Sequence, residues 1–347
     1  MTGNEALPPS TQQIDAGAAR RQRRRLAASG EAPWLHQEVA SRMLDRLPVI
    51  RLQPTAVLQS RPSTGGGDAG LRQHYPQATQ LWLEPESDIR ALQQPRARRG
   101  FMQSVMDKLR GGSATELVAE PPAGAAQLAW SNMELHAEAD KPALVKRWHA
   151  GLAVEGCLMF SCLGPDSFIE LRPIYAREGW GPPAPDWVDM HDLGDLLVHA
   201  GFADPVMDQE HLRLTWGSPQ DLLRDLRALG GNLAPARMRG LRTQAWRDRL
   251  LAALESLRGP DGRLALSIEL VYGHAFKPQP KVKVAATTEV SLDQMRAMVR
   301  GAGKHRPPSR AGSARPPRTV RRQSGCQRER ASILRVILGS SARGGRS

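Results

Sequence analysis

Three consecutive glycines, Gly65, Gly66 and Gly67, lie in a loop that follows a short apolar run ending at Leu58. Glycine has no Cβ, so such a segment lets the backbone turn tightly and approach a ligand closely. The same residues are also compatible with an ordinary flexible loop. The loop is therefore a candidate ligand-binding turn, and the residues around it must decide between the two interpretations.

Polar side chains stand near the ends of two further apolar runs. Glu84 closes the run 80–84, and Ser131 and Asn132 lie near the end of 128–133. In open α/β sheets, ligands bind beyond the carboxyl ends of the strands. A carboxylate at that position can accept hydrogen bonds from both hydroxyls of a ribose, although Glu84 is also compatible with a solvated acid at a strand end. Ser131 and Asn132 can line the same cleft, or they can form a helix cap or turn.

Other residue types that often carry chemistry show no such pattern. The spacing of three histidines matches no zinc-binding pattern, and structural or cleft-lining roles are expected for them: His136, His191 and His274. Three acids flank the start of a predicted helix, where negative charge complements the helix dipole: Asp189, Asp192 and Asp195. We therefore expect no metal site, and we interpret these acids as structural.

Short apolar runs of strand length alternate along the chain with segments of helical periodicity. Strands are expected at 55–60, 80–84, 116–120, 128–133, 157–163, 205–216 and 264–276. Helices are expected at 32–47, 70–74, 87–92, 101–109, 142–152, 190–202, 219–229 and 244–258, the last two capped by Ser218 and Thr243. This alternation predicts an α/β fold with a doubly wound, mostly parallel seven-stranded sheet, helices on both faces, and a helical insert at about 217–260 before the last strand.

Charge separates a nearly neutral body from a basic tail. The net charge is +13, but residues 301–347 contain twelve Lys or Arg and one acid, Glu329, which leaves only +2 for the first 300 residues. We expect a flexible basic arm at 1–30, a folded domain at 31–280, an extension at 281–347, and a disordered tail from about 301. The tail could bind nucleic acid non-specifically through phosphates, but it has no aromatic residue for base stacking. A dedicated nucleic-acid function is therefore not expected.

The lengths of the apolar runs and the positions of the cysteines indicate the cellular compartment of the protein. No apolar run approaches the roughly 20 residues needed to cross a bilayer, and the amino end lacks the pattern of an export signal. The three cysteines, Cys157, Cys162 and Cys326, form no CxxC pair. We expect a cytoplasmic protein with free, buried thiols and no membrane partner.

Five segments, which follow one another in the same order along the chain, resemble one enzyme family, the biotin-pathway malonyl-acyl-carrier-protein O-methyltransferases. The segments LAWSNMELH at 128–136 and LMFSCLGPD at 158–166, with ELR at 170–172, are similar to the fourth and fifth strands of that family and the turns after them. VDMHDLGD at 188–195, AGFADPVMD at 200–208 and VYGHA at 271–275 complete the match. The resemblance covers roughly 127–277. It implies a class I methyltransferase, Rossmann-like fold with S-adenosylmethionine as cofactor.

The cofactor loop departs from the pattern of that family, in which strand one ends in an acid-Gly-x-Gly loop whose backbone approaches S-adenosylmethionine. Here Gln59 stands near the place of the acid, Pro62 removes a backbone donor, and the glycines come later. The resemblance implies cofactor contacts for Gly65, Gly66, Gly67, Glu84, Ser131 and Asn132. The altered loop leaves open a second interpretation, a relative that keeps the fold without catalysis and acts as a binding partner or regulator.

The resemblance also implies the reaction, methyl transfer to the free carboxylate of a malonyl group carried on acyl-carrier protein. Carboxylic acids titrate near pH 4, so this nucleophile is already ionised at neutral pH and needs no general base. Arg172, after the fifth strand, is the candidate catalytic anchor, because a guanidinium fork matches a carboxylate. The alternatives are that Arg172 is a surface arginine and that the enzyme methylates a different carboxylate acceptor.

The acyl-carrier partner is acidic as a class, so a basic docking face is expected. The helical insert contains seven arginines: Arg224, Arg227, Arg237, Arg239, Arg242, Arg247 and Arg249. These arginines either form a lid that contacts the carrier or cover the solvated faces of two helices, and the sequence does not distinguish the two.

Overall fold

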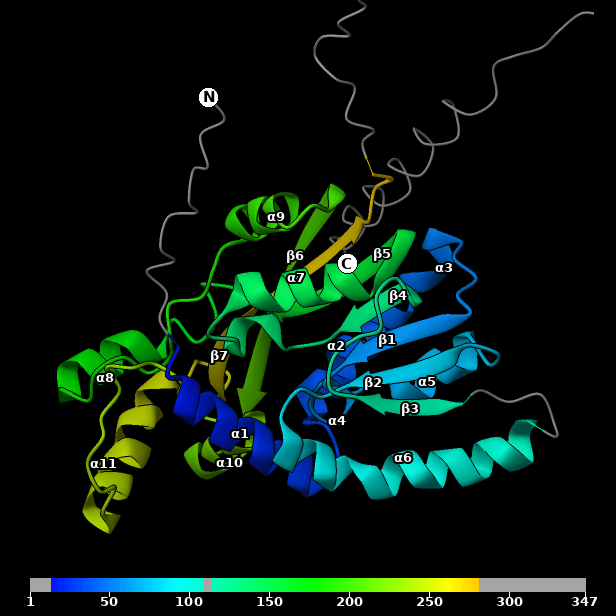
Figure 1. The fold of residues 1–347 in the computed structure, drawn as a ribbon. Coiled ribbons are helices and arrows are strands. Elements are labelled where there is room, and N and C mark those ends of the chain that lie inside the picture. Colours follow the sequence, from blue (N-terminus) through cyan, green and yellow to red (C-terminus); the bar gives the residue numbers. More distant parts are fainter. Residues whose placement is uncertain (1–13, 109–113, 281–347) are drawn as a thin grey trace, which may run out of the picture. The chain divides into compact units, whose positions relative to one another are not determined.

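Seven strands form a single sheet in the order β3-β2-β1-β4-β5-β7-β6. The computed structural model describes residues 14–108 and 114–280 (Figure 1). Strands β1 to β5 pair in parallel, and β7 runs antiparallel between β5 and β6. The strands are β1 Ala56–Ser60, β2 Thr79–Leu83, β3 Thr115–Val118, β4 Ala126–Ser131, β5 Leu152–Leu163, β6 Ala203–Trp216 and β7 Leu264–Phe276. The predicted fold class, a mostly parallel seven-stranded sheet, is confirmed.

Helices cover both faces of the sheet, as predicted. The main helices are α1 Ala16–Ser29, α2 Trp34–Leu44, α3 Leu47–Ile50, α4 Pro62–Gly65, α5 Asp68–His74, α6 Ser87–Lys108, α7 Lys141–Gly151, α8 Leu171–Glu178, α9 Met190–His199, α10 Pro219–Leu229 and α11 Gln244–Leu254. Two single turns of 3-10 helix, η1 Leu135–Ala137 and η2 Glu255–Leu257, complete the set. One buried cluster joins the sheet to α2 and α5, and another joins it to α7 and α9.

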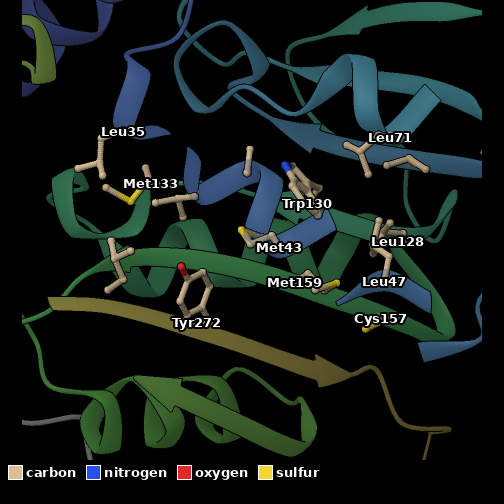
Figure 2. Packing of buried hydrophobic residues seen from close by; sticks show 14 of the residues in the cluster. Leu35, Met43, Leu47, Leu71, Leu128, Trp130, Met133, Cys157, Met159 and Tyr272 are labelled. Carbon is tan, nitrogen blue, oxygen red and sulfur yellow. The ribbon is translucent and has the colours of Figure 1, made fainter. Parts of the chain in front are cut away.

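Side chains of the central strands β1 and β4 alternate between these two clusters. Val57 and Leu128 belong to the cluster under α2, whereas Leu58 and Ala129, one residue further along, belong to the cluster under α7. Figure 2 shows the first cluster, in which Trp130 of β4 lies among methionine and leucine side chains from the sheet and α2. Because both faces are buried, the strands are nearly continuous in hydrophobicity, and this produced the apolar runs in the sequence.

The predicted insert is present between β6 and β7. Helix α10 begins at Ser218, whose side chain accepts a hydrogen bond from the Asp221 N–H, and α11 begins at Thr243, which accepts from the Trp246 N–H. A side-chain oxygen at this position satisfies one of the N–H groups left free at a helix start. Both predicted caps are therefore confirmed.

Several helices differ from expectation. The helix expected at 32–47 ends earlier, as α2, and is followed by the separate short helix α3. The separate helices expected at 87–92 and 101–109 are one helix, α6, which contains Pro95. The short helices α4 and α8 fall in segments expected as loops. The flexible arm expected at 1–30 is corrected for residues 16–29, which form α1 beside α6 (Figure 1). An N-cap at Asp15 and contacts with the body hold this helix in place.

The folded unit ends at Gln279. The predicted extension at 281–347, with its basic tail and Cys326, lies outside the described residues. Within them, Cys157 and Cys162 are free and buried, and burial raises the pKa of both thiols to about 12. No helix in the described part of the chain combines the length and the apolar character needed to span a membrane.

Candidate active site

The strand order reverses between β1 and β4, which places the expected ligand crevice beyond the ends of these two strands. Ser60 and Ser131, the last residues of β1 and β4, are directly paired, and Ser60 is also paired with Leu83 of β2. The residues that follow, Arg61 and Glu84, therefore meet at the same edge of the sheet. This juxtaposition brings the predicted site residues of three strands together.

Arg61 fills the centre of this edge. Its Nε donates to Glu134 Oε1 at 2.7 Å and its Nη1 donates to Glu86 Oε1 at 3.0 Å. Its Nη2 donates to Glu138 Oε2 at 3.3 Å, and Glu84 Oε1 lies 3.9 Å from Nη1. The Arg61 side chain is only 5% exposed. We call this group, Arg61 with Glu84, Glu86, Glu134 and Glu138, the arginine cluster.

The predicted ribose acid, Glu84, belongs to the arginine cluster and is 1% exposed. Its carboxylate accepts hydrogen bonds from the Glu86 N–H and from Gln93 Nε2, both at 3.2 Å. Burial raises the pKa of Glu84 to about 7, and the nearby Arg61 opposes this increase. The solvated-acid alternative is therefore excluded, and the hydrogen-bonding capacity of Glu84 is directed at protein groups.

The glycine loop also approaches protein. A Cβ on Gly65 would lie 2.7 Å from the backbone oxygen of Asn132, and one on Gly67 would lie 3.1 Å from the Trp130 ring. Gly66 and Gly67 have φ of 77° and 91°, a region that favours glycine. The segment is thus a tight, packed turn around α4 rather than a flexible loop. Its close approach is to the turn after β4.

Ser131 and Asn132 are buried, and their side chains are hydrogen-bonded within the protein. Ser131 Oγ donates to Glu134 Oε2 at 2.7 Å. Asn132 Nδ2 donates to the carbonyls of His36 and Gly65, and its Oδ1 accepts from Ser161 Oγ at 2.6 Å. Asn132 thus fastens the glycine loop to β4 and to the start of α2. The turn interpretation describes both residues in this structure.

Gln59 stands near the place of the family's usual acid at the end of β1 and is fully buried. Its Nε2 donates to Asp68 Oδ1 at 2.7 Å and to Gln80 Oε1 at 2.8 Å. An acid at this position would face two acceptors, whereas the amide nitrogen donates to both. The buried Gln59 Oε1 has no hydrogen-bond partner among the described residues. The substitution is accommodated by Asp68, at the start of α5.

A cavity of about 640 Å³ has Met133 and His136, which are close in sequence to Glu134 of the arginine cluster, in its lining. Leu35, His36, Met133 and His136 form the wall nearest to the glycine loop, and the remaining walls come mainly from α1, α8, α10, α11 and the loops between them. None of the six predicted cofactor residues lines it. A volume of this size suits a small organic ligand.

The charged residues of the cavity are all basic. Five arginines line it, and no Asp or Glu does: Arg21, Arg25, Arg227, Arg237 and Arg242. Arg237 is paired with Asp15 at 2.8 Å, and Arg242 lies 4.9 Å from the Trp246 ring. The other walls are mostly leucine and aromatic side chains. The cavity is therefore chemically suited to an anionic ligand with an apolar part.

His136 contributes a polar atom to this cavity, as its predicted cleft-lining role allows. Its Nδ1 is buried and has no hydrogen-bond partner among the described residues. Burial, with smaller contributions from His36 and Lys141, lowers the pKa of His136 to about 3, so the ring is neutral at pH 7. His191 is exposed on α9, where Asp189 caps the helix by accepting from the His191 and Asp192 N–H groups.

Arg172, the predicted carboxylate anchor, is exposed on α8 and does not line the cavity. Its Nη2 donates to the Pro165 carbonyl at 2.5 Å. Its role as an anchor stays a prediction.

One group of possible metal ligands, Asp166, His211 and Glu269, is mostly exposed, and Glu269 already accepts from the Asp166 N–H at 2.7 Å.

Named relatives match about three quarters of the chain. A malonyl-[acyl-carrier protein] O-methyltransferase from Gallionella capsiferriformans is 39% identical over 273 residues, covering 78% of this chain and 93% of the relative. Proteins with the same name from Laribacter hongkongensis and a Methylovorus species are 40% and 37% identical and are covered over 86% and 91% of their lengths. The chain belongs to the malonyl-[acyl-carrier protein] O-methyltransferase family.

Other comparisons add little to this assignment. No protein-family model matches the chain. A solved putative methyltransferase from Bacillus halodurans aligns with 69% of this chain and all of its own length, at 12% identity and a TM-score of 0.44. The family assignment therefore rests on the named relatives.

For a member of the malonyl-[acyl-carrier protein] O-methyltransferase family, the part of the site expected to bind the methyl donor, S-adenosylmethionine, is unusual. S-adenosylmethionine needs space and free acceptors beyond β1 and β2, and here Arg61 fills that space while Glu84 is buried beneath it. The residues in their described positions do not fit the cofactor. Sequence reasoning missed Arg61, Glu86, Glu134 and Glu138, although each follows a predicted strand end closely enough to reach this edge.

Proposed function

We propose that this chain catalyses methyl transfer from S-adenosylmethionine to the free carboxylate of a malonyl group carried on acyl-carrier protein, which yields the malonyl methyl ester. The observation that carries the proposal is 39% identity to a malonyl-[acyl-carrier protein] O-methyltransferase over 93% of that relative's length. The arginine-lined cavity supports it, because an anionic acceptor needs cations and no competing carboxylate.

Methylation of a carboxylate acceptor requires the reactants to be positioned and does not require proton transfer. The malonyl carboxylate is ionised at neutral pH, so no residue has to remove a proton. Arginines at the cavity can hold the carboxylate by paired hydrogen bonds, and the apolar walls exclude water around it. Holding two reactants in line can lower the barrier by roughly 7 to 11 kcal/mol. Arg172 and the cavity arginines Arg227 and Arg242 are the candidate anchors.

The direct test is an assay of the full chain with malonyl-carrier protein and S-adenosylmethionine, with the product detected as the methyl ester by mass spectrometry. The matched control is acetyl-carrier protein, which has the same thioester but no free carboxylate. We expect ester on the malonyl carrier alone. A second comparison with succinyl-carrier protein separates a malonyl-specific enzyme from a carboxyl methyltransferase with another acceptor.

The arginine cluster favours a second candidate function. A relative that keeps the acceptor cavity but does not use a methyl donor would bind the carrier protein as a partner or regulator without modifying it. Binding of malonyl-carrier protein, measured by calorimetry, together with absence of ester would support this candidate. Absence of both binding and ester would contradict both candidates.

A further inference from the structure

We propose that Arg61 is a built-in competitor for the methyl-donor site, so that a donor binds only after the Arg61 guanidinium has left the arginine cluster. The identity of the donor rests on the proposed function. The closure of the site does not, because it follows from the position and contacts of Arg61.

The backbone directs Arg61 into the crevice. Arg61 follows β1 immediately, its N–H donates to the Leu83 carbonyl of β2 at 3.0 Å, and its φ of 48° lies in the left-handed region. The hydrogen bond to β2 and the turn of α4 that begins at Pro62 fix this residue on both sides. Glycine adopts this conformation without strain, so Arg61→Gly should preserve the turn while removing the side chain.

Charge explains why Arg61 stays in place. Four carboxylates surround the Arg61 guanidinium, and Arg61, Glu84 and Glu134 are almost fully shielded from water. Glu86 also pairs with Arg23, so Glu84, Glu134 and Glu138 are the carboxylates that depend on Arg61. Breaking a buried pair by removing one partner leaves an uncompensated charge, which is strongly unfavourable. A donor that displaces Arg61 must therefore replace its interactions with Glu134, Glu86 and Glu138 as well as those with Glu84.

The arginine cluster also indicates which ligand would bind more tightly after the removal of Arg61. Without the Arg61 guanidinium, Glu84, Glu134 and Glu138 lose their cation while Glu86 keeps its pair with Arg23, and carboxylates without a cation attract one. S-adenosylmethionine carries a positively charged sulfonium, whereas its product S-adenosylhomocysteine carries a neutral thioether. The removal of Arg61 should therefore strengthen binding of the sulfonium compound more than binding of the thioether.

The experiment is calorimetric titration of the full-length protein with S-adenosylmethionine and with S-adenosylhomocysteine. The test variants are Arg61→Gly and the double variant Arg61→Gly/Glu134→Gln, which also removes one of the carboxylates left without a cation. Arg61→Lys is the matched control, because it keeps a long cationic side chain at the same position. Thermal unfolding and circular dichroism establish that each protein is folded before it is titrated.

We expect Arg61→Gly/Glu134→Gln to bind S-adenosylmethionine at least about tenfold more tightly than wild type, because the apparent affinity is reduced by the fraction of open sites. Arg61→Lys should bind like wild type. Equal affinity in wild type and the double variant would overturn the proposal. So would a folded double variant that binds neither compound, since Arg61 would then not be what closes the site.

The malonyl-carrier assay separates this inference from the proposed function. A double variant that binds the donor tightly but makes no malonyl ester would support the closure by Arg61 and contradict the proposed acceptor. Ester formation by wild type with unchanged donor affinity in the variants would support the reaction and overturn the closure.

Discussion

At the scale of single residues, burial makes the ionisation of Glu84 depend on folding. The carboxyl group has an ordinary pKa of 4.5 and a pKa of about 7 in the folded protein, mainly because it is desolvated. Between these two values the folded state holds a proton that the unfolded state has released. The contribution of this group to stability is therefore full below about pH 4.5 and is lost as the pH rises through about 7.

We predict that Glu84→Gln removes this dependence, because the amide keeps the shape of the side chain and does not titrate. Wild type should lose about 3 kcal/mol of unfolding free energy relative to Glu84→Gln between about pH 4 and about pH 8. Urea unfolding at the two pH values measures the difference. The control is Glu116→Gln, an exposed carboxylate on β3, which should follow wild type. Parallel pH profiles for wild type and Glu84→Gln would contradict the prediction.

At the scale of elements, the antiparallel pair β5 and β7 depends on one glycine. Gly273 of β7 is paired with Phe160 of β5, and a Cβ at Gly273 would lie 2.3 Å from Phe160 Cε1 and 2.9 Å from Met207 Sδ. The Phe160 ring is buried and packed against Trp148. It therefore cannot move away without disturbing the core under α7.

We predict that Gly273→Ala lowers the free energy of unfolding by about 1 to 3 kcal/mol, the usual cost of inserting a methyl group into a packed core. The matched control is Gly217→Ala, because a Cβ at Gly217 would meet no atom within 4 Å. Denaturant unfolding of both variants tests the prediction. Equal stability of the two would show that the β5–β7 pair tolerates a side chain at position 273.

At the scale of the whole molecule, the fold gathers arginines of the insert and of α1, which are far apart in the sequence, around one cavity. Arg227 at the end of α10 and Arg242 before α11 line it together with Arg21 and Arg25 of α1. No carboxylate in the described part of the chain forms an ion pair with these four arginines. Their charges are therefore not neutralised by an ion pair within the described residues, although Arg25 donates to backbone carbonyls and Arg242 stacks on Trp246. The docking interpretation of the insert stays a prediction.

We predict that Arg227→Glu/Arg242→Glu slows association with malonyl-carrier protein about tenfold at low salt, with a smaller effect at high salt, because steering by surface charge is screened. The matched control is Arg224→Glu/Arg247→Glu, which changes the charge of the insert equally at positions outside the cavity lining. Surface plasmon resonance at two salt concentrations measures the association rates. An equal loss in both variants would assign docking to the overall charge rather than to the cavity.

The sequence by itself determined the sheet, the insert and the family. Short apolar runs such as the one that forms β4, and capping residues such as Ser218 and Thr243, are local signals, so they can be recognised without knowing which elements pack together. The same signals failed where packing overrides local preference: Pro95 does not interrupt α6, and α1 is held by contacts with distant segments.

Only the tertiary structure decided what the strand-end residues do. Glu84, Ser131 and Asn132 were identified from their positions after strands, but their partners come from Arg61, Glu134 and the glycine loop. The ion pairs of Arg61 join residues that are 23 positions apart in the chain, for Glu84, and 77 positions apart, for Glu138. Such pairs cannot be recognised from periodicity in the sequence. The sequence therefore located the edge of the sheet where a donor would bind, and the three-dimensional arrangement of charge showed that Arg61 stands there.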